Sequence, residues 1–95
     1  MKVGILTLEL SLHSPRSLKE KRAILKPLIE RIRSQYNVSV AELGYQDDWR
    51  RAQIGVAHIS NDGGVSDRVL AKLVNRVEHE DRGRILIESY RIELV

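Results

Sequence analysis

The order in which two hydrophobic periodicities follow one another constrains the fold of this chain more than any other feature. Apolar residues that alternate with polar ones are typical of strands, and apolar residues that recur every three or four positions are typical of helices. These patterns predict strands over residues 2–13, 37–44, 49–60 and 84–95, and helices over residues 17–33 and 65–80. The element order is therefore β-α-β-β-α-β.

This order predicts an α+β protein with the ferredoxin-like fold. Right-handed crossovers give a four-stranded antiparallel sheet in the order 4-1-3-2, with two helices on one face. We expect one domain over residues 1–95, because no linker or repeat interrupts the pattern. The open face of the sheet would carry Val3, Ile5 and apolar residues of the last strand. That strand is apolar on both faces, with Ile85 and Ile87 on one and Leu86, Tyr90, Ile92 and Leu94 on the other.

The helix predicted over residues 17–33 has a well-defined start. Ser17 and Glu20 have the spacing of a capping box, in which the hydroxyl accepts a hydrogen bond from the backbone three residues on. Pro27 lies inside the helix and removes one backbone hydrogen bond. We expect a kink there and not an end, because the apolar stripe continues in phase after Pro27.

Positive charge is concentrated in the same segment. Residues 16–33 hold seven Lys and Arg against two Glu, a surplus of five, in a chain whose formal net charge is +3. Four of the cations form a row along one edge of the apolar stripe. Such a row is either a solvated helix face or a surface that binds an anionic partner, and nucleic acid is the leading candidate for that partner. The candidate nucleic-acid-binding residues are Arg16, Lys19, Lys21, Arg22, Lys26, Arg33, Trp49 and Arg50.

Composition excludes several classes of protein. The chain has no cysteine, so it has neither a disulfide framework nor a thiolate zinc site. His13, His58 and His79 lack the spacing of a metal motif, and we expect no metal and no cofactor. His58 falls on the buried face of its strand, where a hydrogen-bonded histidine is expected.

The same sequence indicates where the protein works. No apolar run approaches membrane-spanning length and no signal-peptide pattern is present, so we expect a cytoplasmic protein with no membrane partner. Eleven arginines against five lysines, with 31% charged residues, are typical of proteins from thermophiles.

Side chains of the types that act in catalysis lie at one end of the predicted sheet, but they do not form a known catalytic motif. That end collects His13, Asp48, His79 and Arg82 beside the start of the first helix. A Ser–His–Asp triad needs a serine held by a histidine, but Ser17 is better explained as a helix cap. An acylphosphatase needs a tight phosphate-binding loop after the first strand, and the glycine-rich loop is missing there. We therefore expect a protein that is not an enzyme.

RNA binding through the open sheet face is also disfavoured. RNA-recognition motifs stack bases on aromatic residues of the two central strands, and here those strands offer Thr7, Glu9 and Gln53. The basic helix still offers a different way to bind RNA, through contacts with the phosphate backbone. Trp49, at the edge of its strand, either stacks on one exposed base or covers the core at the hairpin.

Several short runs form a recognisable pattern, and they are HS at 13–14, SLK at 17–19, KR at 21–22, NVSVAE at 37–42, DW at 48–49 and RA at 51–52. This pattern resembles the YlxP-like family of small bacterial proteins, a domain of unknown function. The resemblance covers nearly the whole chain and implies a ferredoxin-like fold and a cytoplasmic protein. Genes of this family often lie beside those of translation factors, which implies RNA or ribosome association. It implies no activity and no site residues.

Two functional hypotheses follow. The first is a non-enzymatic protein that binds RNA or a ribosomal surface through the basic helix and the adjoining turns. The alternative is a homodimeric protein-interaction or small-ligand-binding module that uses the open sheet face or the edge of the last strand, since long apolar edges need cover.

Overall fold

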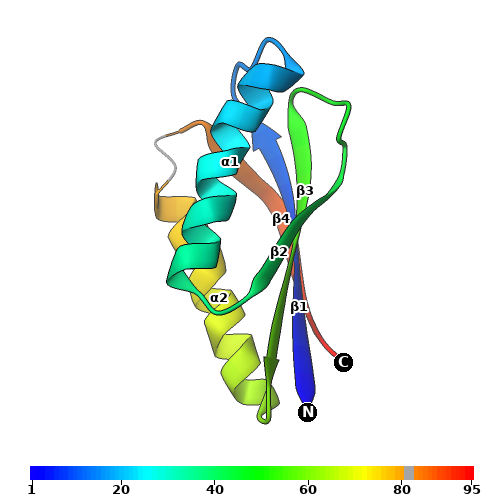
Figure 1. Ribbon diagram of the computed structural model, residues 1–95, viewed down its shortest axis with the longest axis vertical. Coiled ribbons are helices and arrows are strands. Elements are labelled where there is room, and N and C mark those ends of the chain that lie inside the picture. The colour runs from blue at the N-terminus through cyan, green and yellow to red at the C-terminus, as the bar shows by residue number, and fades with distance from the viewer. Residues whose placement is uncertain (81–82) are drawn as a thin grey trace.

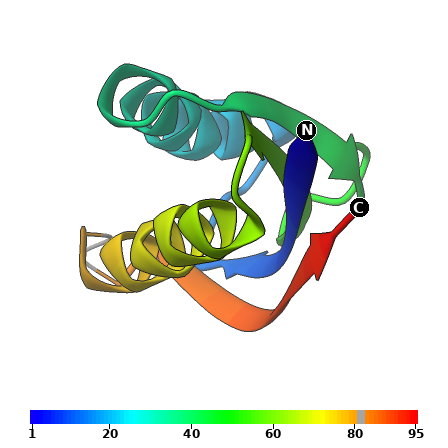
Figure 2. The same ribbon diagram turned by 90° about the horizontal axis from the view of Figure 1, so that it is seen from below.

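The computed structural model describes residues 1–80 and 83–95. Its elements follow the predicted order (Figure 1) and are β1 (Lys2–Leu12), α1 (Leu18–Gln35), β2 (Ser39–Gly44), β3 (Arg51–Ser60), α2 (Gly63–Glu80) and β4 (Ile85–Leu94). The strands form one antiparallel sheet in the order β2-β3-β1-β4. Both helices cover the same face of this sheet (Figure 2). The predicted element order, strand order and helix placement are therefore confirmed.

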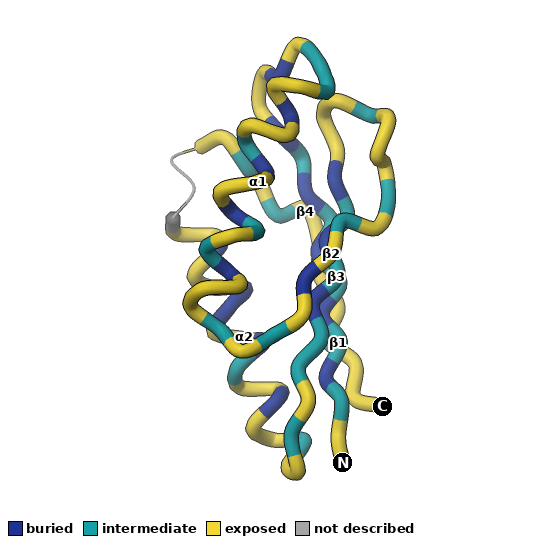
Figure 3. Tube along the Cα trace, viewed as in Figure 1, coloured by how far each residue is buried: buried dark blue, intermediate teal, exposed yellow. Residues whose placement is uncertain are grey.

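The core lies between the sheet and the two helices. Along β1 every second residue from Gly4 to Leu12 is buried, which is the alternation expected of a strand with one covered face. Buried positions on the helices recur every three or four residues (Figure 3). The leucines of β1 thus face the helices, as predicted. The main core side chains are Leu6, Leu8, Leu10, Leu12, Leu25, Leu28, Ile32, Ile54, Val56, Leu70, Leu73 and Val77.

Helix α1 starts and continues as its sequence indicates. The Ser17 hydroxyl accepts a hydrogen bond from the Glu20 N–H at 3.1 Å, which is the predicted cap. The helix runs through Pro27 and on to Gln35. At its end the Tyr36 N–H donates to the Ile32 carbonyl at 3.0 Å. The apolar contacts on both sides of Pro27 hold the helix together across the missing backbone bond.

The last strand differs from its prediction because of a β-bulge. Ser89 lies opposite Glu9, whereas Ile87 lies opposite Leu10, so Glu88 is the extra residue. A bulge shifts the alternation of side chains by one position. As a result, the apolar residues before and after it share the helix-facing side, and the prediction of two apolar faces was wrong. The helix-facing positions are Ile85, Ile87, Tyr90, Ile92 and Leu94, and the open-face positions are Leu86, Ser89, Arg91 and Glu93.

Gly4 lies where α2 packs tightly against the sheet. A Cβ atom at Gly4 would lie 2.9 Å from Leu70 Cδ1 and 3.0 Å from Ser66 Cβ, and both side chains are fully buried. We expect Gly4→Ala to lower the free energy of unfolding by about 2 kcal/mol, because a packed core cannot accept the methyl group without moving α2. Thermal or urea unfolding measures the change.

Gly55→Ala provides the matched control for that substitution. It also lies inside a strand of the sheet, and its added Cβ would meet Leu43 Cδ1 at 2.5 Å. Leu43 is 55% exposed and its side chain can turn away into solvent. We therefore expect a change of about 0.5 kcal/mol or less. Equal losses for the two variants would show that packing against α2 is not the cause.

Candidate nucleic-acid interface

The start of α1 and the loop between β2 and β3 lie together at one end of the molecule. Figure 1 shows this end at the top, with α1 extending beyond the end of α2. The two segments are far apart in the sequence, and a single side chain of α1, Lys21, joins them. Most backbone positions on the outer side of this end are exposed (Figure 3).

Lys21 is one of the most deeply buried side chains in the described structure, with 2% exposure. Its Nζ donates hydrogen bonds to the carbonyl oxygens of Tyr45 at 2.6 Å and Asp48 at 2.8 Å. The Glu42 carboxylate lies 3.2 Å away as its counter-ion. Lys21 was predicted to bind nucleic acid, and that prediction was wrong, because its charge is used to hold the β2–β3 loop against α1.

The position of Lys21 in the helix explains its burial. It precedes Leu25 and Leu28 by four and seven residues, so it points to the same side as the core residues of α1. This phase was present in the sequence and is the signal that separates Lys21 from its neighbours Lys19 and Arg22. A lysine on an apolar stripe needs buried acceptors, and the loop provides them.

The β2–β3 loop is also fixed by Asp48. Its carboxylate accepts a hydrogen bond from the Arg50 N–H at 2.8 Å and another from Arg51 Nε at 3.0 Å. These two interactions, the backbone bond first, hold the pKa of Asp48 below its ordinary value. Since the folded-state pKa is the lower one, they stabilise the loop at neutral pH and are lost as the pH falls through that value. The Arg51 guanidinium also lies over the Tyr45 ring, 4.4 Å from its centroid.

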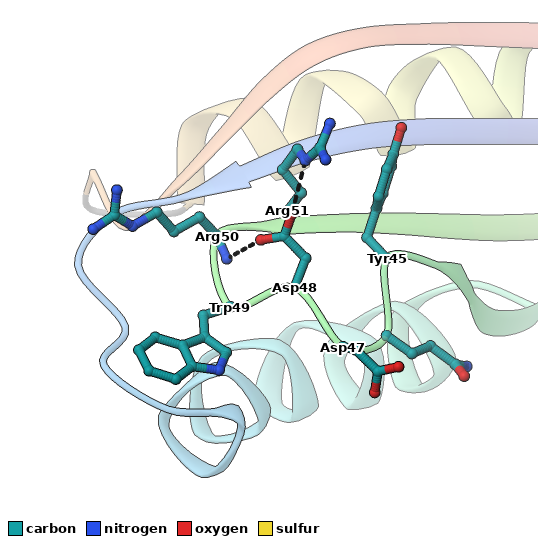
Figure 4. A pocket seen from close by; sticks show the side chains of 7 residues that line it. Tyr45, Asp47, Asp48, Trp49, Arg50 and Arg51 are labelled. Carbon is teal, nitrogen blue, oxygen red and sulfur yellow. Dashed lines mark hydrogen bonds and ion pairs between the residues drawn. The ribbon is translucent and has the colours of Figure 1, made fainter.

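Trp49 lies on this loop and not at the start of the third strand as predicted, since β3 begins at Arg51. The loop surrounds an open hollow of about 760 Å³. Figure 4 shows the indole beside the first turns of α1, while Arg50 extends away from the loop. Tyr45 and Arg51 lie on the opposite side of the loop from the indole. The indole is 47% exposed, so it covers the end of the core only in part.

The remaining candidate cations stay on the surface. Arg16, Lys19, Arg22, Lys26 and Arg50 are all exposed, and none forms an ion pair with an acidic residue in the described ranges. Arg33 is exposed too, but its Nη2 donates to the Val40 carbonyl of β2 at 2.9 Å. This contact shows that the basic row of α1 lies on the side of the β2 edge. We call Arg16, Lys19, Arg22, Lys26, Trp49 and Arg50 the basic surface.

The structure gives other partners to two side chains that a Ser–His–Asp triad would use, although no catalytic residue was predicted. Ser17 caps α1 and Asp48 binds Arg50 and Arg51, so neither is free for a catalytic triad. His79 was predicted at this end, but it lines a hollow with Tyr36, which follows the last residue of α1. That prediction was wrong because α1 extends past α2 (Figure 1). Arg82, also predicted at this end, lies outside the described residues.

His58 has the hydrogen-bonded, half-buried position that the sequence predicted. Its Nδ1 lies 2.8 Å from Ser66 Oγ, which lies 2.9 Å from Ser60 Oγ, which donates to the Asp62 carbonyl at 2.7 Å. The two hydroxyl groups supply two protons for three hydrogen bonds. The third proton must therefore sit on Nδ1 of His58, and the chain of bonds ties β3 to the start of α2.

Within the described residues, no group of three or more His, Cys, Asp or Glu side chains could hold a metal ion. Neither α1 nor α2 is long and apolar enough to cross a lipid bilayer.

Solved structures resemble this fold over its full length at low sequence identity. A de novo designed protein with a ferredoxin fold aligns with a TM-score of 0.53 at 15% identity, covering 100% of this chain and 83% of the design. SnoaB, a cofactor-independent oxygenase from Streptomyces nogalater, aligns with a TM-score of 0.50 at 11% identity, covering 99% of this chain and 90% of SnoaB. Likeness at such identities supports the fold alone, and it confirms the ferredoxin-like prediction.

Sequence comparisons identify the family. The uncharacterized protein YlxP of Bacillus subtilis strain 168 is 36% identical over 72 residues, which make up 76% of this chain and 78% of YlxP. The profile of a family described as a protein of unknown function, DUF503, matches residues 3–90. The chain therefore belongs to the DUF503 family, as its resemblance to YlxP-like proteins implied.

Proposed function

We propose that this protein is a non-enzymatic RNA-binding protein that contacts the RNA backbone through the basic surface. One observation carries the proposal: the five cations of the surface are exposed and have no acidic partner among the described residues. Elsewhere on the surface, Arg51 pairs with Asp48 at 3.0 Å and Arg91 pairs with Glu93 at 2.8 Å. The surface cations of α1 and Arg50 thus differ from Arg51 and Arg91, whose charges are already paired.

The arrangement of the charges suits a polyanion. Lys19 and Lys26 are seven residues apart, which is roughly 10 Å along the helix at 1.5 Å per residue. Arg16 and Arg50 flank the start of this row, on the segments before α1 and before β3. Cations spread over such a length meet more than one phosphate, and each contact releases condensed counter-ions. Ribosomal RNA is the first RNA to test, because the family resemblance implies an association with translation.

A salt titration tests the proposal. Binding of the protein to purified ribosomal RNA is measured by filter binding or anisotropy at several salt concentrations. Five phosphate contacts predict a slope of log K against log [salt] of about −4. A slope near zero would contradict backbone binding by this surface. A pull-down from cell lysate, with and without ribonuclease, then asks whether the captured partner depends on intact RNA.

The second candidate function is a homodimeric interaction or small-ligand module that uses the open sheet face. Its supporting observation is an apolar area on that face, where Leu43 is 55% and Ile59 63% exposed beside the half-buried Val3 and Ile5. A two-fold dimer would bring the same area of two copies together. Light scattering at high micromolar concentration tests it, and a monomeric mass would argue against the dimer.

A further inference from the structure

We infer that the basic surface selects RNA with unpaired nucleotides, because the β2–β3 loop presents Trp49 as a stacking platform for one base. This inference rests on the proposed function and names the class of RNA that the same site takes. It adds an aromatic contact to a surface that would otherwise recognise phosphates alone.

The first argument is that the loop fixes the backbone on both sides of Trp49 while leaving its side chain half exposed. The residue before it, Asp48, has its carbonyl bound by Lys21 at 2.8 Å and its carboxylate bound by the Arg50 N–H at 2.8 Å. The Arg50 N–H belongs to the residue after Trp49. Both neighbours are therefore fixed by contacts that do not involve the indole, which remains 47% exposed.

A fixed aromatic ring binds a base better than a mobile one. Binding a ligand to a flexible loop costs conformational entropy, and a loop that is ordered in advance avoids that cost. Lys21 makes the contacts that order the loop, and it is itself shielded from solvent. We therefore assign Lys21 as a positioning residue, which acts on the ligand only through Trp49.

The second argument is the chemistry around the indole. Lys21, in the first turns of α1, binds the carbonyl of Asp48 at 2.8 Å. This contact brings the next residue, Trp49, to the part of the helix that carries Lys19 and Arg22. A nucleotide offers both groups that such a site recognises, a flat base for the ring and a phosphate for the cations. In a duplex the base faces are stacked on one another, so an unpaired nucleotide is needed to reach the ring. An acidic peptide would satisfy the cations but has no base to stack.

The intrinsic fluorescence of Trp49 tests the inference directly, since it is the only tryptophan of the chain. Single-stranded decaadenylate and a G·C-rich RNA duplex of the same length, which stays paired under these conditions, are titrated at 50 mM salt. We expect quenching by the single strand and little quenching by the duplex. Trp49→Ala is expected to weaken binding of the single strand about tenfold and leave duplex binding unchanged. Trp49→Phe should keep most of the single-strand affinity that Trp49→Ala loses. Tyr90→Ala, at another exposed aromatic residue on β4, should leave that affinity unchanged.

The outcomes separate this inference from the proposed function. Equal quenching by both RNAs, or unchanged single-strand affinity in Trp49→Ala while binding stays salt-dependent, overturns base stacking and leaves backbone binding in place. Quenching of the same size by a polyglutamate peptide also overturns it, because that ligand has no base. Failure of both RNAs to bind overturns the proposed function together with the inference.

Lys21→Met tests the positioning role. At a temperature where the far-ultraviolet spectrum shows the variant folded, we expect a smaller quenching amplitude with the single strand and an unchanged salt slope. Lys19→Met is the matched control, because the same change at an exposed position should lower the slope by about 1 and keep the quenching amplitude. Full quenching in Lys21→Met would show that the loop presents Trp49 without the contacts made by Lys21.

Discussion

Replacing Lys19, Arg22 and Lys26 together by glutamate is expected to weaken binding to ribosomal RNA at least about 100-fold at 50 mM salt. A cation beside an anionic surface contributes on the order of 1 kcal/mol, so removing three costs about 3 kcal/mol, and the new carboxylates add repulsion. The salt slope should fall by about 3, since three phosphate contacts disappear. Anisotropy titrations of wild type and variant at four salt concentrations measure both effects.

A control with the same change in net charge is needed for this result. Lys2, Arg68 and Lys72 are exposed and lie at the start of β1 and on α2, away from the basic surface. Their triple replacement by glutamate also changes the formal charge by six units. We expect a loss of about fivefold or less, because only long-range electrostatics changes. Equal losses in the two triple variants would mean that net charge, and not a located surface, controls binding.

The charge reversal should leave the fold intact. All three side chains of α1 are exposed, and substitutions at such positions change the free energy of unfolding by about 0.5 kcal/mol or less each. Thermal unfolding of both variants therefore separates a lost surface from a lost fold. A large fall in the melting temperature of the α1 variant would show that the row contributes to packing.

The fold could be predicted from the sequence because most of its elements obey a single periodicity. The β1 leucines alternate without a break, and the Ser17 cap and the stripe after Pro27 fix α1 from local sequence alone. The bulge at Glu88 could not be predicted in the same way. Nothing in the local residues marks it, and it is visible only in the pairing of β4 with β1. The sequence predicts a strand for both halves of β4. The shift in side-chain alternation between the halves, however, depends on how β4 pairs with the neighbouring strand.

The candidate site was predictable in its location and not in the roles of its residues. The concentration of charge along α1 was evident, and five candidate cations of residues 16–33 are on the surface as expected. Lys21 differs because the acceptors for its ammonium group, the carbonyls of Tyr45 and Asp48, lie more than twenty residues away. Its phase on the apolar stripe showed that it was buried, but only the folded loop shows what it binds. The same contact fixes Asp48, the residue before Trp49.

Lys21→Met is expected to lower the free energy of unfolding by about 3 kcal/mol. The methionine fills most of the volume of the lysine but donates no hydrogen bond, so two carbonyl groups and the Glu42 carboxylate lose their shared partner. Removing one member of a buried charged cluster costs about 3–5 kcal/mol, and the 25% exposure of Glu42 places this case at the lower end. For a domain of this size the melting temperature should fall by roughly 15 °C, as measured by calorimetry.

Two comparisons decide whether the lost contacts of Lys21 cause this fall in stability. Lys19→Met makes the same chemical change on the exposed side of α1 and should shift the melting temperature by about 3 °C or less. Glu42→Gln keeps an oxygen acceptor beside Lys21 but removes the counter-ion, and the double variant Lys21→Met/Glu42→Gln should be less destabilised than the sum of the two single changes. That non-additivity follows because the unpaired carboxylate accounts for part of the loss in Lys21→Met. Strict additivity would show that the ammonium group acts only through the loop carbonyls. A fall in melting temperature no larger than that of Lys19→Met would show that the loop packs on α1 without the contacts of Lys21.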